Sequence, residues 1–139
     1  MAQEFDLQRF VDAQSPVYET VRTELKAGHK RSHWMWFIFP QIAGLGRSET
    51  ARHYALSGVA EAQAYLAHPL LGSRLEESCQ LLMDVEHRTA SEIFGYPDDL
   101  KLHSSLTLFA QAAPYHRLFA ACLAKYFNGW RDSSTLKLM

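Results

Sequence analysis

The chain has 139 residues, of which 47% are hydrophobic and 12% aromatic, a composition typical of a packed domain and not of a disordered chain. Its formal net charge of −1 provides no general electrostatic attraction to nucleic acid, which argues against nucleic-acid binding. The stretch Met1–Asp12 lacks the apolar run of a signal peptide and no membrane-spanning run follows it, so we expect a cytoplasmic protein without membrane contact.

Two helices are expected before residue 29. Within residues 5–14, one helical face is formed by Leu7, Phe10 and Val11. A second helix is expected to begin at Ser15–Pro16, because proline suits the first helical position, and to end at Gly28. Its apolar residues recur every four positions: Val17, Val21 and Leu25.

The segment from Lys30 to Gln41 combines cations, a histidine and two tryptophans with an apolar run. The run 34–39 is too short to cross a bilayer, which needs roughly 20 apolar residues, so we expect its aromatic side chains inside the protein and the polar residues at the edge of the core. Arginine binds phosphate or carboxylate, tryptophan stacks on flat rings and histidine exchanges protons near neutral pH. The segment predicts a site for an anionic, planar ligand, formed by Arg31, Ser32, His33, Trp34, Trp36 and Gln41.

Several helix-start signals follow. Two glycines predict a loop over residues 41–48 that can approach a ligand closely, and Ser48 can cap a short helix through Tyr54. Further helices are expected to begin after Ser57–Glu61, at Pro69 and at the capping box Thr89–Glu92.

A long helix is expected from Pro97, because aspartates at 98 and 99 suit a helix start. In this helix Lys101, Ser104 and Ser105 share one face. Asp98 is a candidate general base and Lys101 a candidate anion ligand, while the two serines indicate a polar contact with the 30–41 segment.

Both segments also have a plainer interpretation. The tryptophans can be core anchors, His33 can bond a backbone carbonyl, and Lys30 and Arg31 can be solvated. In the helix, simple capping explains at least one aspartate, and small residues such as serine permit close helix packing.

The remaining chain completes an all-α domain. A helix over residues 115–126 and a last turn capped at Asp132 are expected. With no repeat or linker, residues 1–139 predict one compact domain of about seven or eight short helices. Cys79 and Cys122 lie in apolar helical patterns and are expected to be buried free thiols.

Signatures of metal and cofactor chemistry are weak or absent. His29 and His33 are four residues apart, but the stop at Gly28 argues against a helix that would bring them together, so we predict no metal site. There is no G-x-S-x-G elbow, and Gly44-Leu45-Gly46 lacks the strand and third glycine of a dinucleotide fold. No cofactor is identified.

Five sequence motifs are distinctive: 31–41 (RSHWMWFIFPQ), 44–48 (GLGRS), 65–69 (YLAHP), 97–102 (PDDLKL) and 104–109 (SSLTLF). With these motifs the chain resembles the bacterial domain of unknown function 1810 family. The resemblance covers nearly the whole chain and implies a compact, mostly helical domain, but no established activity. Some members carry a calpastatin label, which this sequence does not support, because calpastatins are long disordered inhibitors.

These observations predict a pocket between the 30–41 segment and the 98–109 helix for a nucleotide-like anion, such as an ADP-ribose derivative. Arg31 and Lys101 would hold the anion, a tryptophan would stack, and His33 or Asp98 would exchange a proton if the ligand is turned over. Whether the protein is an enzyme stays open. The alternative is a protein–protein interaction module or homodimer that uses the aromatic 33–39 segment, since aromatic residues and arginine also form interface hot spots.

Overall fold

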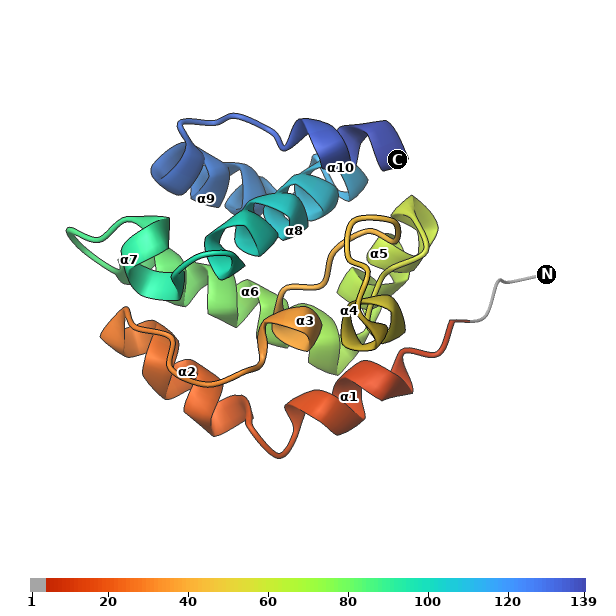
Figure 1. The fold of residues 1–139 in the computed structure, drawn as a ribbon, viewed down its shortest axis with the longest axis horizontal. Coiled ribbons are helices and arrows are strands. Elements are labelled where there is room, and N and C mark those ends of the chain that lie inside the picture. Colours follow the sequence, from red (N-terminus) through yellow and green to blue (C-terminus); the bar gives the residue numbers. More distant parts are fainter. Residues whose placement is uncertain (1–4) are drawn as a thin grey trace.

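The computed structural model describes residues 5–139, and Figure 1 shows the order of its helices. This part contains no β-strand, only an isolated parallel bridge between Ile42 and Leu56. The all-α class is therefore confirmed. The helices are α1 (Gln8–Gln14), α2 (Tyr18–Ala27), α3 (Met35–Ile38), α4 (Glu49–His53), α5 (Val59–Ala67), α6 (Pro69–Asp84), α7 (Ala90–Phe94), α8 (Asp98–Ala112), α9 (Arg117–Phe127) and α10 (Ser133–Leu138).

The number of helices differs from the expected seven or eight. The described residues form ten, of which α3, α4, α7 and α10 are only four to six residues long. Hydrophobic periodicity needs a window of about 11 residues or more to reveal a helix. Such short turns therefore escape it, and α3 was not predicted as a helix at all.

The predicted capping residues set many of the helix ends. Gly28 ends α2 in the left-handed conformation with φ of 69°, a backbone shape that glycine adopts without steric cost. Ser48 accepts a hydrogen bond from the Ala51 amide at the start of α4, and the reciprocal capping box of Thr89 and Glu92 opens α7. These predictions are confirmed.

Two predicted helix starts need correction. The second helix begins at Tyr18 and not at Pro16, because the Ser15 amide still bonds to Val11 as the end of α1. Pro97 occupies the N-cap of α8 without a side-chain cap. Asp98 forms ion pairs instead of capping the helix, whereas Asp99 accepts a hydrogen bond from the Leu100 amide at 2.9 Å.

Helix α8 is the centre of the fold. It packs against α3, α5, α7, α9 and α10, and nine of its 15 residues are buried. In Figure 1 it crosses the molecule between α9 and α3, both of which it contacts. The predicted site residues at its N-terminal end therefore lie where a central helix meets the 30–41 segment.

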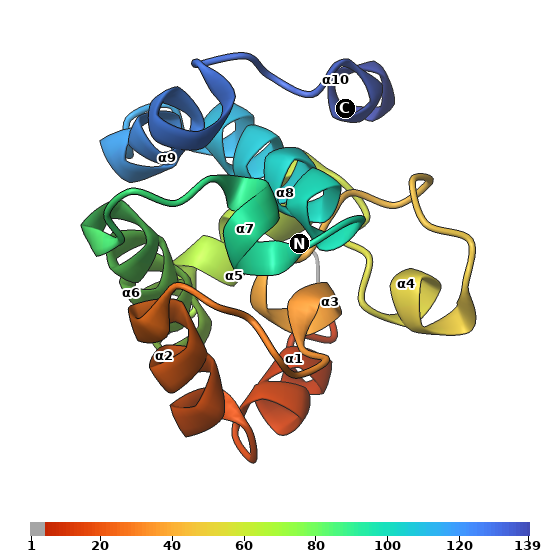
Figure 2. The same ribbon diagram turned by 60° about the vertical axis from the view of Figure 1, so that its left-hand side comes forward.

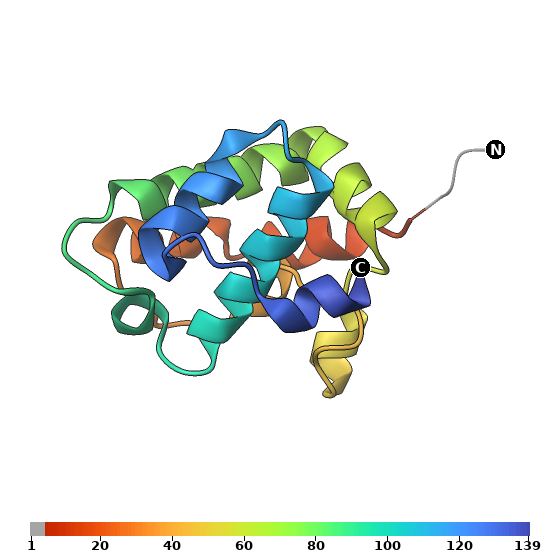
Figure 3. The ribbon, with the colours of Figure 1, turned by 90° about the horizontal axis from the view of Figure 1, so that it is seen from above.

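The short helix α4 lies at the periphery (Figures 2 and 3). Arg9 anchors the chain after it, donating to the carbonyls of His53 at 2.9 Å and Ala55 at 3.0 Å. The same guanidinium pairs with Glu61 of α5 at 3.1 Å. The α4 loop is thus held in place beside α3. No helix among residues 5–139 is long and apolar enough to cross a membrane.

Candidate functional site

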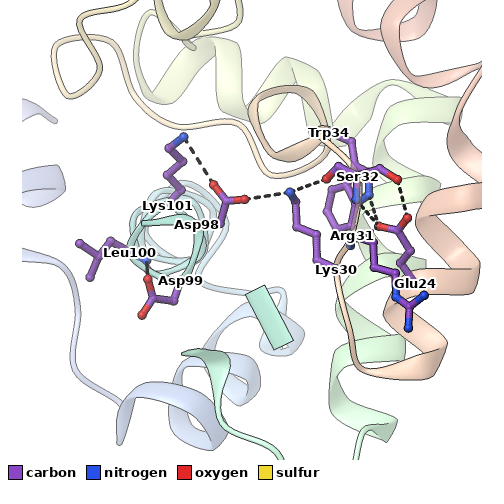
Figure 4. A network of polar contacts seen from close by, with 9 residues as sticks. All are labelled: Glu24, Lys30, Arg31, Ser32, Trp34, Asp98, Asp99, Leu100 and Lys101. Atoms are coloured by element: carbon purple, nitrogen blue, oxygen red, sulfur yellow. Dashed lines mark hydrogen bonds and ion pairs between the residues drawn. The ribbon is translucent and has the colours of Figure 1, made fainter. Parts of the chain in front are cut away.

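Glu24 of α2 organises the beginning of the 30–41 segment. This residue is only 8% exposed, and its carboxylate accepts hydrogen bonds from the amides of Arg31 at 2.8 Å and Ser32 at 3.0 Å. The Ser32 hydroxyl donates at 2.6 Å and the Trp34 indole N–H at 2.9 Å (Figure 4). Four donors from one short segment converge on one carboxylate, and this fixes the conformation of residues 31–34.

The environment of Glu24 keeps it ionised. Burial by itself raises the pKa of a carboxyl group, but the hydrogen bonds from the Ser32 hydroxyl, the two amides and the Trp34 indole outweigh it. Together they lower the pKa of Glu24 from 4.5 to about 2. The carboxylate is thus a charged structural anchor, because donors stabilise the ionised form.

Lys30 joins this segment to α8. Its ammonium forms an ion pair with Asp98 at 2.8 Å and donates to the Ser32 carbonyl at 2.5 Å (Figure 4). The same ammonium lies 5.0 Å from the centre of the Trp34 ring. The Lys30 side chain is 6% exposed and that of Asp98 is 20% exposed. A largely buried ion pair therefore fills the contact between the two segments for which a pocket was predicted.

Lys101 lies on the other side of the same carboxylate. Its ammonium is 3.5 Å from Asp98, on the second carboxylate oxygen. It also lies 4.8 Å from the centre of the half-buried Trp36 ring, within the range of a cation–π interaction. Asp98, Lys101 and Trp36, all predicted site residues, are thus brought together by the fold.

Other predicted residues lie apart from this group. Trp34 is 1% exposed, so its ring faces the core. His33 is exposed, and its ring forms no hydrogen bond within residues 5–139. Ser104 bonds to Asp132 at the start of α10 and not to the 30–41 segment. The hydroxyl of Ser105 is buried and has no partner among the described residues.

Two hollows border Trp36 on the side of α4. The larger, of about 530 Å³, is lined by Trp36, Phe37, Glu49, Thr50, His53 and Tyr54. The smaller, of about 20 Å³, also contains Gln41 and Tyr54. The indole of Trp36 therefore lines an open hollow and also makes a cation–π contact with the Lys101 ammonium.

The family follows from comparison with known sequences. A family model described as "Protein of unknown function (DUF1810)" matches residues 4–139. The chain belongs to this family. The DUF1810 fold is also seen in the crystal structure of the conserved hypothetical protein Rv1873 from Mycobacterium tuberculosis, which is 56% identical with a TM-score of 0.96, over 97% of this chain and 96% of that one. No curated protein matches the sequence.

Glu24, a main organiser of this DUF1810 domain, is not among the residues predicted from the sequence. Its position offered a signal, because it lies on the same helical face as Val21 and Leu25, which form the apolar stripe of α2. A charged residue within an apolar stripe needs buried partners. The following segment, rich in donors, was the nearest source of them.

Proposed function

We propose that the protein binds a small, anionic, nucleotide-like molecule, such as an ADP-ribose derivative, at the rim where α3 meets α8. The observation that carries the proposal is the Trp36 ring, which lies 4.8 Å from the Lys101 ammonium and lines a hollow of about 530 Å³ between α3 and α4. Ligand pockets typically measure roughly 300 to 1,000 Å³. A hollow with an aromatic wall that also contacts a cation suits a ligand that has both a phosphate and a planar ring.

The local charge balance supports an anionic ligand. Two ammonium groups, those of Lys30 and Lys101, share the single carboxylate of Asp98. Lys30 takes the closer contact, at 2.8 Å against 3.5 Å. Lys101 is 25% exposed and can turn toward a phosphate while the Lys30 pair stays intact.

The lining of the hollow suggests how the ligand would be oriented. Glu49 lies in its wall, so a phosphate is expected away from Glu49, where it can reach Lys101 beside Trp36. The flat ring is expected against Trp36 and Tyr54, where the amide of Gln41 lies in the adjoining small hollow. If the bound molecule is turned over, His33 and Asp98 are the predicted proton carriers.

Isothermal titration with ADP-ribose, ADP, AMP and inorganic phosphate tests the proposal. Lys101→Met preserves the length of the side chain and removes its charge; Lys137→Met, on exposed α10, is the matched control. We expect saturable binding of a nucleotide that weakens about tenfold or more in Lys101→Met, since a charged hydrogen bond is worth about 1.5 to 3 kcal/mol. Folded protein that binds none of the probes, or equal affinity in both variants, would contradict it.

Tryptophan fluorescence provides an independent measurement of ligand binding at Trp36. Trp130 is 73% exposed and Trp34 is buried, so a Trp130→Phe background leaves Trp36 as the accessible indole. A stacked ligand is expected to quench this emission, and Trp36→Leu should abolish the change.

The interaction-module alternative predicts a different result. Within 34–39 only Trp36 and Phe37 are partly exposed, and the other four side chains are buried, which leaves this segment a small contact surface. Light scattering separates the two functions. A measured mass of twice the monomer's 15.9 kDa would indicate a dimer. If Phe37→Ala restores the monomer mass and the protein does not respond to nucleotides, the interaction module is favoured.

A further inference from the structure

A third hollow lies on the surface of α2, and Trp36 takes no part in its lining. It measures about 410 Å³, and no residue of its lining is shared with the hollows at Trp36. Helix α2 contributes Thr20, Thr23, Ala27 and the carboxylates of Glu19 and Glu24, and the segment that follows contributes His29 and Arg31. The hollow therefore combines apolar, hydroxyl-bearing and acidic side chains with two basic ones.

The fold places Arg31 there through its backbone. Gly28 turns the chain at the end of α2, and the Arg31 amide is held by Glu24 at 2.8 Å. The side chain then runs back along α2, away from Asp98 and Lys30 (Figure 4). Arg31 is thus separated from Lys101, with which it was predicted to share one anion.

The charges around the hollow leave this guanidinium available. Glu24 takes part in the lining, but its carboxylate already accepts four hydrogen bonds. Glu19, also in the lining, pairs with Arg22 at 2.9 Å. Within residues 5–139, the guanidinium of Arg31 forms no ion pair or hydrogen bond. A planar fork of donors without a partner, beside an imidazole, fits an oxyanion.

We propose that this hollow binds a small phosphate monoester, independently of the function proposed for the Trp36 rim. Arg31 donates two hydrogen bonds to the phosphate, and His29 stands beside the same group as a second donor. The organic part of the ligand packs on Ala27 and on the methyl groups of Thr20 and Thr23. The phosphate dominates recognition, because the remaining lining has no aromatic face for a ring.

The test is an amide ¹H–¹⁵N NMR titration of the full chain with glycerol 3-phosphate, inorganic phosphate and glycerol. Saturable shifts are expected at Thr20, Thr23, Ala27 and His29 with glycerol 3-phosphate, smaller ones with inorganic phosphate, and none with glycerol. Arg31→Gln should weaken binding about tenfold or more, as expected for loss of a charged hydrogen-bond donor.

Lys26→Gln is the matched control, since Lys26 is an exposed cation of α2 outside this lining. Its affinity should equal that of the unsubstituted protein. Absence of saturable shifts, shifts with glycerol alone, or equal weakening in Lys26→Gln would overturn the proposal. Lys101→Met separates the two sites: it should leave this titration unchanged, while Arg31→Gln should leave nucleotide binding at the Trp36 rim unchanged.

Discussion

The carboxylate of Glu24 accepts the indole N–H of Trp34 at 2.9 Å. Trp34 is the largest of the fully buried side chains that the structure describes. Its orientation therefore depends on an ionised group on another helix. The two basic side chains of the same segment diverge from this anchor, Lys30 toward Asp98 and Arg31 along α2 (Figure 4).

Glu24→Gln is expected to reduce stability at neutral pH. A pKa lowered from 4.5 to about 2 corresponds to about 3 kcal/mol of stability at neutral pH, because each factor of ten in the proton affinity is worth about 1.4 kcal/mol. The folded pKa lies below the unfolded one, so this contribution is complete above pH 4.5 and is lost as the pH falls toward 2. Urea unfolding between pH 2 and pH 7 measures it.

The control for this variant is Glu19→Gln, which removes a carboxylate that is 84% exposed. Its effect should stay below about 0.5 kcal/mol. A stability of Glu24→Gln equal to that of this control at neutral pH would contradict the anchoring role.

Asp98→Asn is expected to cost more stability than Lys30→Met. The first leaves a buried ammonium beside the Ser32 carbonyl and the Trp34 ring but without an anionic partner, and an uncompensated buried charge costs about 3 to 5 kcal/mol. The second leaves Asp98 paired with Lys101. Asp99→Asn is the neighbouring control, because its carboxylate accepts only the Leu100 amide. Chemical denaturation of the three variants gives the order, and an Asp98→Asn variant as stable as Asp99→Asn would refute it.

Ser105→Ala is expected to stabilise the protein by about 1 to 2 kcal/mol, since it removes a buried hydroxyl that has no partner and improves helix propensity. Ser104→Ala, one residue earlier, should destabilise by about 1 kcal/mol through loss of the Asp132 contact. Thermal unfolding compares the pair. A lower melting temperature for Ser105→Ala would mean that its hydroxyl has a partner in solution.

Gly72→Ala is expected to destabilise the protein by about 1 to 3 kcal/mol, the usual cost of overpacking. A Cβ at Gly72 would lie 2.2 Å from the Leu66 carbonyl oxygen. Because that atom belongs to the backbone, the chain at Leu66 would have to shift. Gly58→Ala is the control, since a Cβ there meets no atom within 4 Å. Calorimetry should show a large fall in melting temperature for the first and little change for the second; equal melting temperatures would show that α5 and α6 separate easily.

The helical class, many of the helix ends and the family could be read from the sequence, because these depend on local signals. Capping signals act within one turn of the chain, as at Gly28, Ser48 and the Thr89–Glu92 box. The periodic spacing of apolar residues that indicates a helix lies within that helix alone. The short α3 was not predicted, because a single helical turn is too short to show a repeat of apolar residues.

The arrangement of the candidate site was decided by the tertiary structure. Lys30, Arg31 and Trp34 are near neighbours in sequence, yet one pairs with α8, one lies along α2 and one is buried in the core. Residue types determined that these side chains could bind anions and rings. Which of them face solvent depends on Glu24 and Asp98, whose charges must find partners across the fold, and sequence spacing carries no information on contacts between distant helices.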